Sequence, residues 1–290
     1  MNGKRALVTG ANTGIGKWTA VGLAERGFSV LVHARSPEKG RAAVDEIRGL
    51  SGNPSVGLVL ADLSSLDAVR ALAAAVLEQC PRLDVLVNNA GLISTRRVET
   101  VDGFESTFAV NHLAPFLLTN LLLDRIRASS PARIVTVSSR AHLSAALDFD
   151  DLDCRRGYAA MDAYARSKLA NVLFTRELAR RLAGSGVSAN CLHPGVVRTE
   201  FGAGGELGGV MGIGWYLMQP FLLSPRQGAE TSIYLATSPD VEDVTGEYFD
   251  RRRVARTASP ARDMAAASRL WRVSAERVGI EPDSTGAASL

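Results

Sequence analysis

The sequence predicts a single α/β domain, doubly wound, in which helices cover both faces of a mainly parallel sheet of about seven strands. Short apolar runs alternate along the chain with longer amphipathic stretches, which is the pattern of parallel strands joined by crossover helices. These runs lack apolar/polar alternation, which indicates strands that are buried on both faces. A chain of 290 residues is long enough for one such domain with a substantial core.

The predicted elements follow from these patterns in chain order. The apolar runs predict strands at Ala6–Val8, Val30–Val32, Val56–Leu60, Val85–Val87, Ile134–Val137 and Val187–Leu192, and Glu247–Phe249 could close the sheet as a seventh. The amphipathic stretches predict helices from the first glycine turn to about Arg26 and over Pro37–Leu50, Leu66–Cys80, Phe104–Ile126 and Ala163–Leu182. No internal repeat or linker divides the chain, so we predict one domain over residues 1–283 and a frayed polar tail at 284–290.

Composition excludes several classes of function. A net charge of +3 is too small to predict a nucleic-acid partner, and we interpret the basic run at 251–256 as a solvated loop. Three scattered cysteines and four scattered histidines lack metal-ligand spacing, so we expect reduced thiols and no metal. The first strand begins close to Met1 and no apolar run approaches the roughly 20 residues that span a bilayer, so we expect a cytoplasmic protein without a membrane span. A helix such as Ala163–Leu182 could carry a homo-oligomer interface.

A glycine-rich turn separates the first strand from the first helix. Gly10, Gly14 and Gly16 lie where a Rossmann fold binds pyrophosphate, because glycine lets the backbone approach the phosphates and the helix start presents free N–H groups. Asn12, Thr13 and Ile15 complete the turn. The spacing is G-x-x-x-G-x-G rather than the general dinucleotide fingerprint. A glycine-rich turn without a ligand is the alternative.

The end of the second strand predicts the choice of cofactor. An NAD site usually has Asp or Glu there, which would repel a 2′-phosphate. This chain has Ala34 and Arg35, and an arginine can pair with that phosphate, so we predict NADP(H) in preference to NAD(H). An exposed arginine without a ligand is the alternative. Asp62 and Leu63 follow the third strand and are placed to close the adenine pocket, although Asp62 could be only a turn or N-cap residue.

Tyr164 and Lys168 are the candidate catalytic pair. They share one helix face, and the lysine ammonium should lower the tyrosine pKa from its ordinary value near 10, so that Tyr164 exchanges a proton with an alcohol or carbonyl. Ser138 and Ser139 end the fifth strand, where a hydroxyl could donate to the substrate oxygen, although paired serines there are also common turn formers. Asn111 lies inside a predicted helix, which suggests a local backbone role or a water relay to Lys168, with a buried amide of no special role as the alternative.

These motifs together resemble the short-chain dehydrogenase/reductase family over nearly the whole chain. The matching segments are Thr9–Gly16, Asn88–Gly91 and Tyr164–Lys168, and the segments 137–142, 167–171, 193–199 and 269–271 are similar to the retinol dehydrogenase and WW-domain oxidoreductase branch. The resemblance implies a catalytic tetrad of Asn111, Ser139, Tyr164 and Lys168. It also implies cofactor contacts from Asn89, Gly91, Tyr164, Lys168, Val197 and Thr199, and it supports Arg35 as an NADP(H) residue.

We therefore expect an NADP(H)-dependent oxidoreductase that interconverts an alcohol and an aldehyde or ketone on a lipophilic small molecule. The lipophilic substrate is inferred from the aromatic and aliphatic segment 201–223, within an expected lid at about 200–227, although Trp215, Tyr216 and Phe221 could instead pack a core or an interface. A catalytically silent protein that senses NADP(H) is the alternative, and it is disfavoured because both Tyr164 and Lys168 are present. Use of the segment 210–223 as an interfacial membrane anchor is disfavoured by its lack of a basic face.

Overall fold

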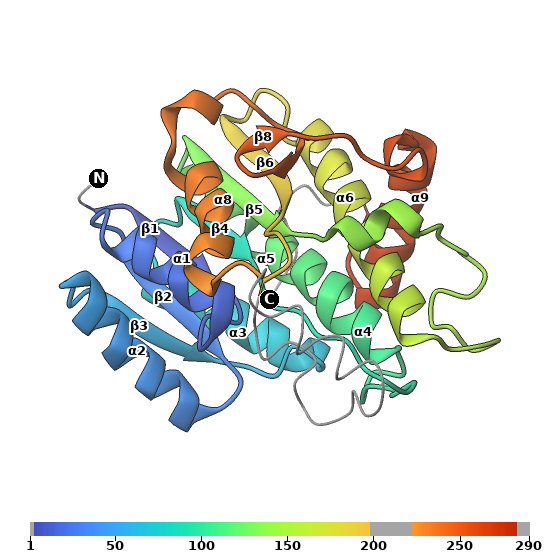
Figure 1. Cartoon of the computed structure of the whole chain (residues 1–290), viewed down its shortest axis with the longest axis horizontal. Helices are drawn as coiled ribbons and strands as arrows, with labels where there is room; N and C mark the ends of the chain where they lie inside the picture. The colour runs from blue at the N-terminus through green and yellow to red at the C-terminus, as the bar shows by residue number, and fades with distance from the viewer. Residues whose placement is uncertain (1–2, 198–221, 283–290) are drawn as a thin grey trace.

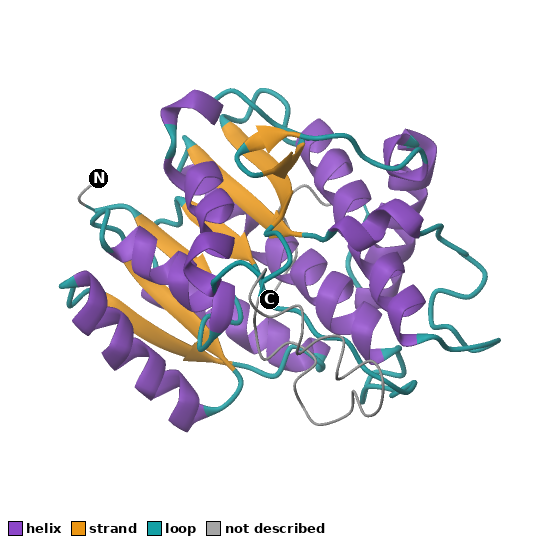
Figure 2. Cartoon of the chain, viewed as in Figure 1, coloured by secondary structure: helices purple, strands orange, loops and turns teal. Residues whose placement is uncertain are grey.

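A twisted eight-stranded sheet forms the centre of the molecule, and helices lie on both of its sides (Figures 1 and 2). The computed structural model describes residues 3–197 and 222–282. The strand order is β3-β2-β1-β4-β5-β6-β7-β8, and every neighbouring pair is parallel except β7 and β8. The doubly wound α/β prediction is confirmed.

The strands coincide closely with the predicted apolar runs. They are β1 (Arg5–Val8), β2 (Ser29–Ala34), β3 (Val56–Leu60), β4 (Val85–Asn88), β5 (Ala132–Val137), β6 (Val187–His193), β7 (Tyr248–Asp250) and β8 (Arg253–Val254). The eighth strand was not predicted. It is two exposed residues long, so it carries no apolar signal, and it pairs antiparallel with β7 across a turn in which Arg251 and Arg252 both have positive φ.

Helices cover the two faces of the sheet in separate layers. The first layer contains α1 (Gly14–Ala24), α2 (Pro37–Ser51) and α8 (Pro225–Thr237). The second contains α3 (Leu66–Gln79), α4 (Ser106–Phe108), η1 (Ala109–Leu113), α5 (Ala114–Ala128) and α6 (Ala160–Arg181), with α9 (Met264–Val278) packed against α6. Short helical turns are η2 (Arg140–Ser144), η4 (Pro239–Val241) and η5 (Pro260–Arg262).

Alternate residues of the strands enter two separate cores. On β1, Ala6 and Val8 belong to the core beneath α1, α2 and α8, whereas Leu7 belongs to the larger core beneath α3, α5 and α6. This division follows from the two-residue period of a strand, which sends successive side chains to opposite faces. Both sets are apolar because both faces are covered, which is why the sequence shows no polar alternation.

The predicted helix Phe104–Ile126 is not one regular helix. Its first turns are α4, its middle is the π-helical segment η1, and α5 continues to Ala128. Within the described ranges the stretch Ser106–Ala128 is the one helix apolar and long enough to cross a membrane, and 94 % of its most apolar window is buried inside the protein. Its apolar residues are thus accounted for by the core. No metal-binding group of three or more His, Cys, Asp or Glu side chains occurs among the described residues.

Candidate active site

The glycine turn lies at the carboxyl edge of the sheet, packed against the turn that follows β4. A Cβ at Gly10 would lie 2.9 Å from the Cα of Ala90, and one at Gly16 would lie 2.4 Å from both the Asn89 amide nitrogen and the Gly10 carbonyl oxygen. Gly10 and Gly14 also have positive φ. A side chain at these positions would therefore strain the backbone or push the two turns apart.

Helix α1 begins without a side-chain cap. Thr13 is its N-cap residue but makes no capping hydrogen bond, and no acidic side chain lies in the first turn. The N–H groups at the helix start therefore face outward with their partial positive charge unopposed, which suits a phosphate. Together with the glycine backbone, this end of the site fits a dinucleotide.

Asn89 and Thr9 tie the two turns together. The Asn89 amide donates to the carbonyl oxygens of Thr9 and Gly10 at 2.8 and 3.2 Å. The Thr9 hydroxyl accepts from the backbone N–H groups of Asn89 and Ala90 at 2.9 and 3.0 Å. Asn89 thus fixes the shape of the glycine turn. Sequence reasoning assigned Asn89 to the cofactor but missed the part played by Thr9.

His33, near the end of β2, has a structural role in this corner. Its Nδ1 accepts the Gly10 N–H at 3.1 Å, and its Nε2 lies 3.2 Å from the carbonyl oxygen of Ala61. The ring therefore carries its proton on Nε2 and links the ends of β1, β2 and β3. Burial lowers the pKa of His33, so it stays neutral and keeps this tautomer. These contacts could not be predicted from the sequence, because one histidine in an apolar strand does not reveal which backbone groups it will bind.

Arg35 and Asp62 stand near each other at the ends of β2 and β3. Arg35 is exposed, and Ala34 beside it is buried. Burial opposes ionisation of Asp62, but hydrogen bonds from the N–H and hydroxyl of Ser64 and the charge of Arg35 lower the pKa of Asp62 overall. Asp62 is therefore a carboxylate held in a turn, which is the local role that the sequence left open.

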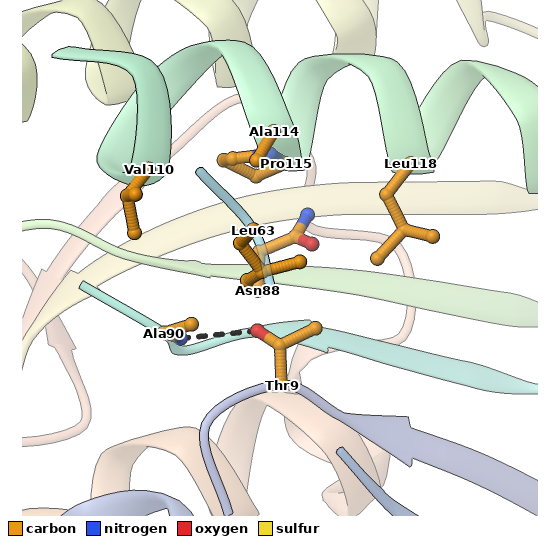
Figure 3. A pocket seen from close by; sticks show the side chains of 8 residues that line it. All are labelled: Thr9, Leu63, Asn88, Ala90, Val110, Ala114, Pro115 and Leu118. Carbon is orange, nitrogen blue, oxygen red and sulfur yellow. Dashed lines mark hydrogen bonds between the residues drawn. The ribbon is translucent and has the colours of Figure 1, made fainter. Parts of the chain in front are cut away.

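Leu63 lines a small enclosed cavity between the turn after β4 and the helix formed by η1 and α5. Its volume is about 10 Å³, which is close to the size of one water molecule. Figure 3 shows Val110, Ala114, Pro115 and Leu118 projecting from the helix toward Thr9, Leu63, Asn88 and Ala90. This cavity is too small for a cofactor or a substrate, so we interpret it as a small gap in the packing behind the turn that follows β4.

The two serines after β5 have separate roles. Ser138 is buried, and its hydroxyl donates to the Lys168 carbonyl oxygen at 2.8 Å, so it fastens β5 to α6. The Ser139 hydroxyl accepts the Ala141 N–H at 3.2 Å and shares a side-chain hydrogen bond with Tyr164. The geometry thus favours Ser139 as the residue beside the tyrosine, as the resemblance implied.

Tyr164 and Lys168 lie one turn apart on α6, as predicted. The Lys168 Nζ is 5.5 Å from the centre of the Tyr164 ring and donates to the Val137 carbonyl oxygen at 3.0 Å. Only one of its three ammonium hydrogens is used in that bond, although the side chain is buried. The remaining donors suit ribose hydroxyls.

The pKa values differ from the sequence-based expectation. In the protein alone, burial raises the pKa of Tyr164, and the hydrogen bond with Ser139 offsets this only in part. Burial also lowers the pKa of Lys168 to about 8. The expectation that the lysine lowers the tyrosine pKa is therefore not met in the protein alone, where desolvation disfavours the charged form of each group.

Asn111 occupies the π-helical segment η1 and bridges three parts of the site. Its Oδ1 accepts the Leu92 N–H at 2.7 Å, while its Nδ2 donates to the Leu92 carbonyl oxygen and the Ser167 hydroxyl, both at 2.9 Å. The Ser167 hydroxyl in turn donates to the Tyr164 carbonyl oxygen at 2.7 Å. Asn111 therefore has the local backbone role that the sequence suggested, at a point where the helix departs from α geometry.

Gly91 and Val197 lie at the same carboxyl edge of the sheet as the catalytic candidates. A Cβ at Gly91 would lie 3.2 Å from the Asn111 Oδ1 and 3.4 Å from the Lys168 Nζ, so a side chain there would press on the Asn111 amide. Val197 is buried, pairs with Leu223 in an isolated parallel bridge, and lies within reach of Ile15 across Gly228. Thr199 and the proposed lid residues Trp215, Tyr216 and Phe221 lie outside the described residues.

Comparisons with known proteins agree with this geometry. The family model for short chain dehydrogenases matches residues 4–205. Human Retinol dehydrogenase 13 is 48 % identical, with 97 % of this chain and 86 % of that protein covered, and human Retinol dehydrogenase 14 is 42 % identical, with 97 % and 88 % covered.

Two solved structures show the same arrangement of elements. A protein of Mycobacterium paratuberculosis is 33 % identical with a TM-score of 0.76, and the match covers 97 % of this chain and 95 % of that one. A 3-oxoacyl (acyl-carrier-protein) reductase of Agrobacterium tumefaciens with NADP bound is 27 % identical with a TM-score of 0.70, covering 86 % and 92 %. Because the family model and these relatives extend over most of the sequence, the chain belongs to the short-chain dehydrogenase/reductase family, in the branch that contains the retinol dehydrogenases.

Proposed function

We propose that this protein is an NADP(H)-dependent oxidoreductase that interconverts an alcohol and an aldehyde or ketone on a lipophilic small molecule. The observation that carries the proposal is the meeting of Ser139, Tyr164 and Lys168 at the sheet edge that also holds the glycine turn. One site is then bordered by a proton donor (Tyr164), a hydroxyl that can polarise an oxygen (Ser139) and a buried cation (Lys168).

Each residue has a chemical role in this proposal. The Ser139 hydroxyl donates to the substrate oxygen as negative charge develops there, and Tyr164 delivers the proton or removes it in the reverse direction. Lys168 would bind ribose hydroxyls, and its charged form would favour the phenolate of Tyr164 against the burial that raises the tyrosine pKa. Asn111 holds Leu92 and Ser167 in place around them. A bound nicotinamide dinucleotide supplies or accepts the hydride.

Arg35 supports the preference for NADP(H). The described structure gives it no ion pair, it is exposed at the end of β2, and the neighbouring strand residue is alanine rather than a carboxylate. An anionic 2′-phosphate would therefore meet the Arg35 guanidinium, with no carboxylate at the end of β2 and with the charge of Asp62 partly offset by Arg35 itself. The NADP-bound reductase of the same fold shows that this architecture accommodates that cofactor in a relative.

The proposal of a lipophilic substrate draws on the relatives, which are named as retinol dehydrogenases at 42 to 48 % identity. The composition of the 201–223 segment is consistent with it.

The test is oxidation of NADPH, and separately of NADH, with a panel of aliphatic, aromatic and isoprenoid aldehydes and ketones that includes retinal. We expect turnover with NADPH that falls by at least about a hundredfold in Tyr164→Phe, because the proton donor is lost. Tight NADPH binding without turnover of any panel member would contradict the enzyme proposal and favour an NADP(H) sensor.

Cofactor choice is tested by Arg35→Asp, with Arg41→Asp on the exposed side of α2 as the matched charge control. We expect Arg35→Asp to weaken NADPH binding by roughly tenfold to a hundredfold, which is the value of a hydrogen bond to a charged group. NADH binding should change little, and Arg41→Asp should bind both cofactors like the wild type. Equal losses for the two cofactors would contradict the role of Arg35.

A further inference from the structure

The corner that carries Ser139 is built by a short 3-10 turn. Ser139 is extended at the end of β5 and serves as the N-cap residue of η2, with its hydroxyl accepting the Ala141 N–H at 3.2 Å. A serine hydroxyl that accepts one hydrogen bond is a better donor of its own proton, because hydrogen bonds in a chain polarise one another. The direction of that proton depends on the position of the Ser139 backbone.

His142 holds that backbone from inside the protein. Its Nδ1 lies 2.7 Å from the Ser139 carbonyl oxygen, and its own N–H donates to the same oxygen at 3.2 Å. A carbonyl only accepts, so Nδ1 carries the proton and the neutral ring presents Nε2 as an acceptor. Burial lowers the pKa of His142, against the hydrogen bond to Ser139, which raises it, and the nearby charge of Arg176 lowers it further. The Nδ1 donor is present in this neutral tautomer and in the protonated ring alike.

The opposite side of the ring is enclosed by β7. The rings of His142 and Tyr248 are 4.7 Å apart between centroids and tilted by 59°, and Tyr248 is buried. Among the described residues, neither the Nε2 of His142 nor the hydroxyl of Tyr248 has a hydrogen-bond partner. A buried polar atom left unpaired costs about 1–3 kcal/mol, so an apolar side chain would fill this position at lower cost. Packing alone therefore does not explain a histidine here.

We propose that His142 is a positioning residue, which holds the Ser139 carbonyl from behind so that the Ser139 hydroxyl meets Tyr164 and the substrate oxygen. The contact of His142 with the site is its hydrogen bond to the Ser139 carbonyl oxygen, so its effect on the reaction passes through the serine. The inference rests on the proposed function, in which Ser139 polarises the substrate oxygen.

Two substitutions separate the hydrogen bond from the packing. His142→Phe keeps a ring against Tyr248 but removes the Nδ1 donor, whereas His142→Asn retains an N–H donor at the equivalent branch of the side chain. The assay uses the panel aldehyde that the wild type reduces fastest with NADPH. We expect His142→Phe to lower kcat on the order of tenfold, with NADPH affinity and KM within about twofold, because a reacting group is displaced while the cofactor site is intact. His142→Asn should recover kcat to within about threefold of the wild type.

A double-mutant cycle with Ser139→Ala tests whether His142 acts on the reaction through Ser139. If His142 acts through the serine, His142→Phe should change kcat by less than about twofold in the Ser139→Ala background. Tenfold losses in both backgrounds, or an unchanged kcat in the single variant, would overturn the inference. A loss that follows thermal instability and is not recovered by His142→Asn would also overturn it. Failure of the proposed function is distinct: Ser139→Ala alone would then retain full activity, or the wild type would reduce no panel member.

Discussion

Lys168 is a buried ammonium whose pKa lies within an accessible pH range. Burial lowers it to about 8, so in the free protein the side chain is charged below that pH and neutral above it. If the ammonium binds the cofactor, NADPH affinity should be constant below pH 8 and should fall as the pH rises through that value, by up to tenfold per pH unit. Fluorescence titration of NADPH between about pH 6.5 and 9.5 measures this.

Lys168→Met is the matched control, since it keeps the unbranched chain and removes the charge. It should bind NADPH more weakly than the wild type at neutral pH and show no alkaline decline. A wild-type dissociation constant that stays flat to pH 9.5 would contradict a role for the lysine charge in binding.

At the scale of elements, the glycine turn and the turn after β4 act as one unit. A methyl group at Gly16 would collide with the Asn89 amide nitrogen and the Gly10 carbonyl oxygen, each 2.4 Å away. Neither can retreat easily, because the Asn89 amide is already bonded to the Thr9 and Gly10 carbonyls. Gly16→Ala should therefore weaken NADPH binding by at least about tenfold through displacement of the turn. Isothermal titration measures the change.

Gly49→Ala on α2 is the control for the effect of adding a methyl group to a helix. A Cβ there meets nothing within 4 Å. We expect it to leave NADPH affinity unchanged and to raise the free energy of unfolding by up to about 1 kcal/mol, because alanine is the better helix former. Similar NADPH affinity in Gly16→Ala and Gly49→Ala would contradict the steric argument.

Asn111 ties the π-helical segment η1 to two other parts of the chain. Asn111 makes three hydrogen bonds to Leu92 and Ser167, which are distant in sequence, whereas Asn120 on α5 donates only to the Phe116 carbonyl of its own helix. Asn111→Ala should lower the free energy of unfolding by about 1–3 kcal/mol, because the partly buried backbone groups of Leu92 and the buried Ser167 hydroxyl lose their partner. Asn120→Ala should cost less, and only Asn111→Ala should also reduce turnover. Urea denaturation measures the stability of the two variants, and kcat measures their turnover. Equal losses of stability and turnover in Asn111→Ala and Asn120→Ala would contradict the bridging role of Asn111.

At the scale of the whole molecule, sequence reasoning reached the features that local patterns determine. Apolar runs such as Val30–Val32 located the strands because burial on both faces leaves a continuous signal, and the spacing of Tyr164 and Lys168 followed from the helical period. The sequence did not predict β8, the break in the helix at η1, or the contacts of His33 and His142. Those depend on partners that meet only when the sheet has assembled, and a lone histidine in the sequence does not reveal them.

The four histidines share one property that belongs to the molecule as a whole. His33, His112, His142 and His193 are all buried, and burial is the largest cause that lowers the pKa of each. For His112 and His193 the pKa falls to about 3 and about 4. The unfolded chain binds protons to these rings below about pH 6.5, while the folded protein does not. The stability they contribute is therefore complete above pH 6.5 and is lost as the pH falls.

The free energy of unfolding should accordingly decrease between pH 6.5 and 5, before most carboxylates titrate. Each of these two histidines should remove about 2 kcal/mol by pH 5, from the linkage between proton binding and folding. His112 lies among Phe108, Phe116 and Phe174, so His112→Phe keeps an aromatic ring there and deletes one titrating group. Urea denaturation at pH 7, 6 and 5 gives the free energy of unfolding at each pH. Between pH 7 and 5 this free energy should fall by about 2 kcal/mol less in His112→Phe than in the wild type. A wild-type stability independent of pH over this range would mean that the buried rings take up protons as readily as the unfolded chain does.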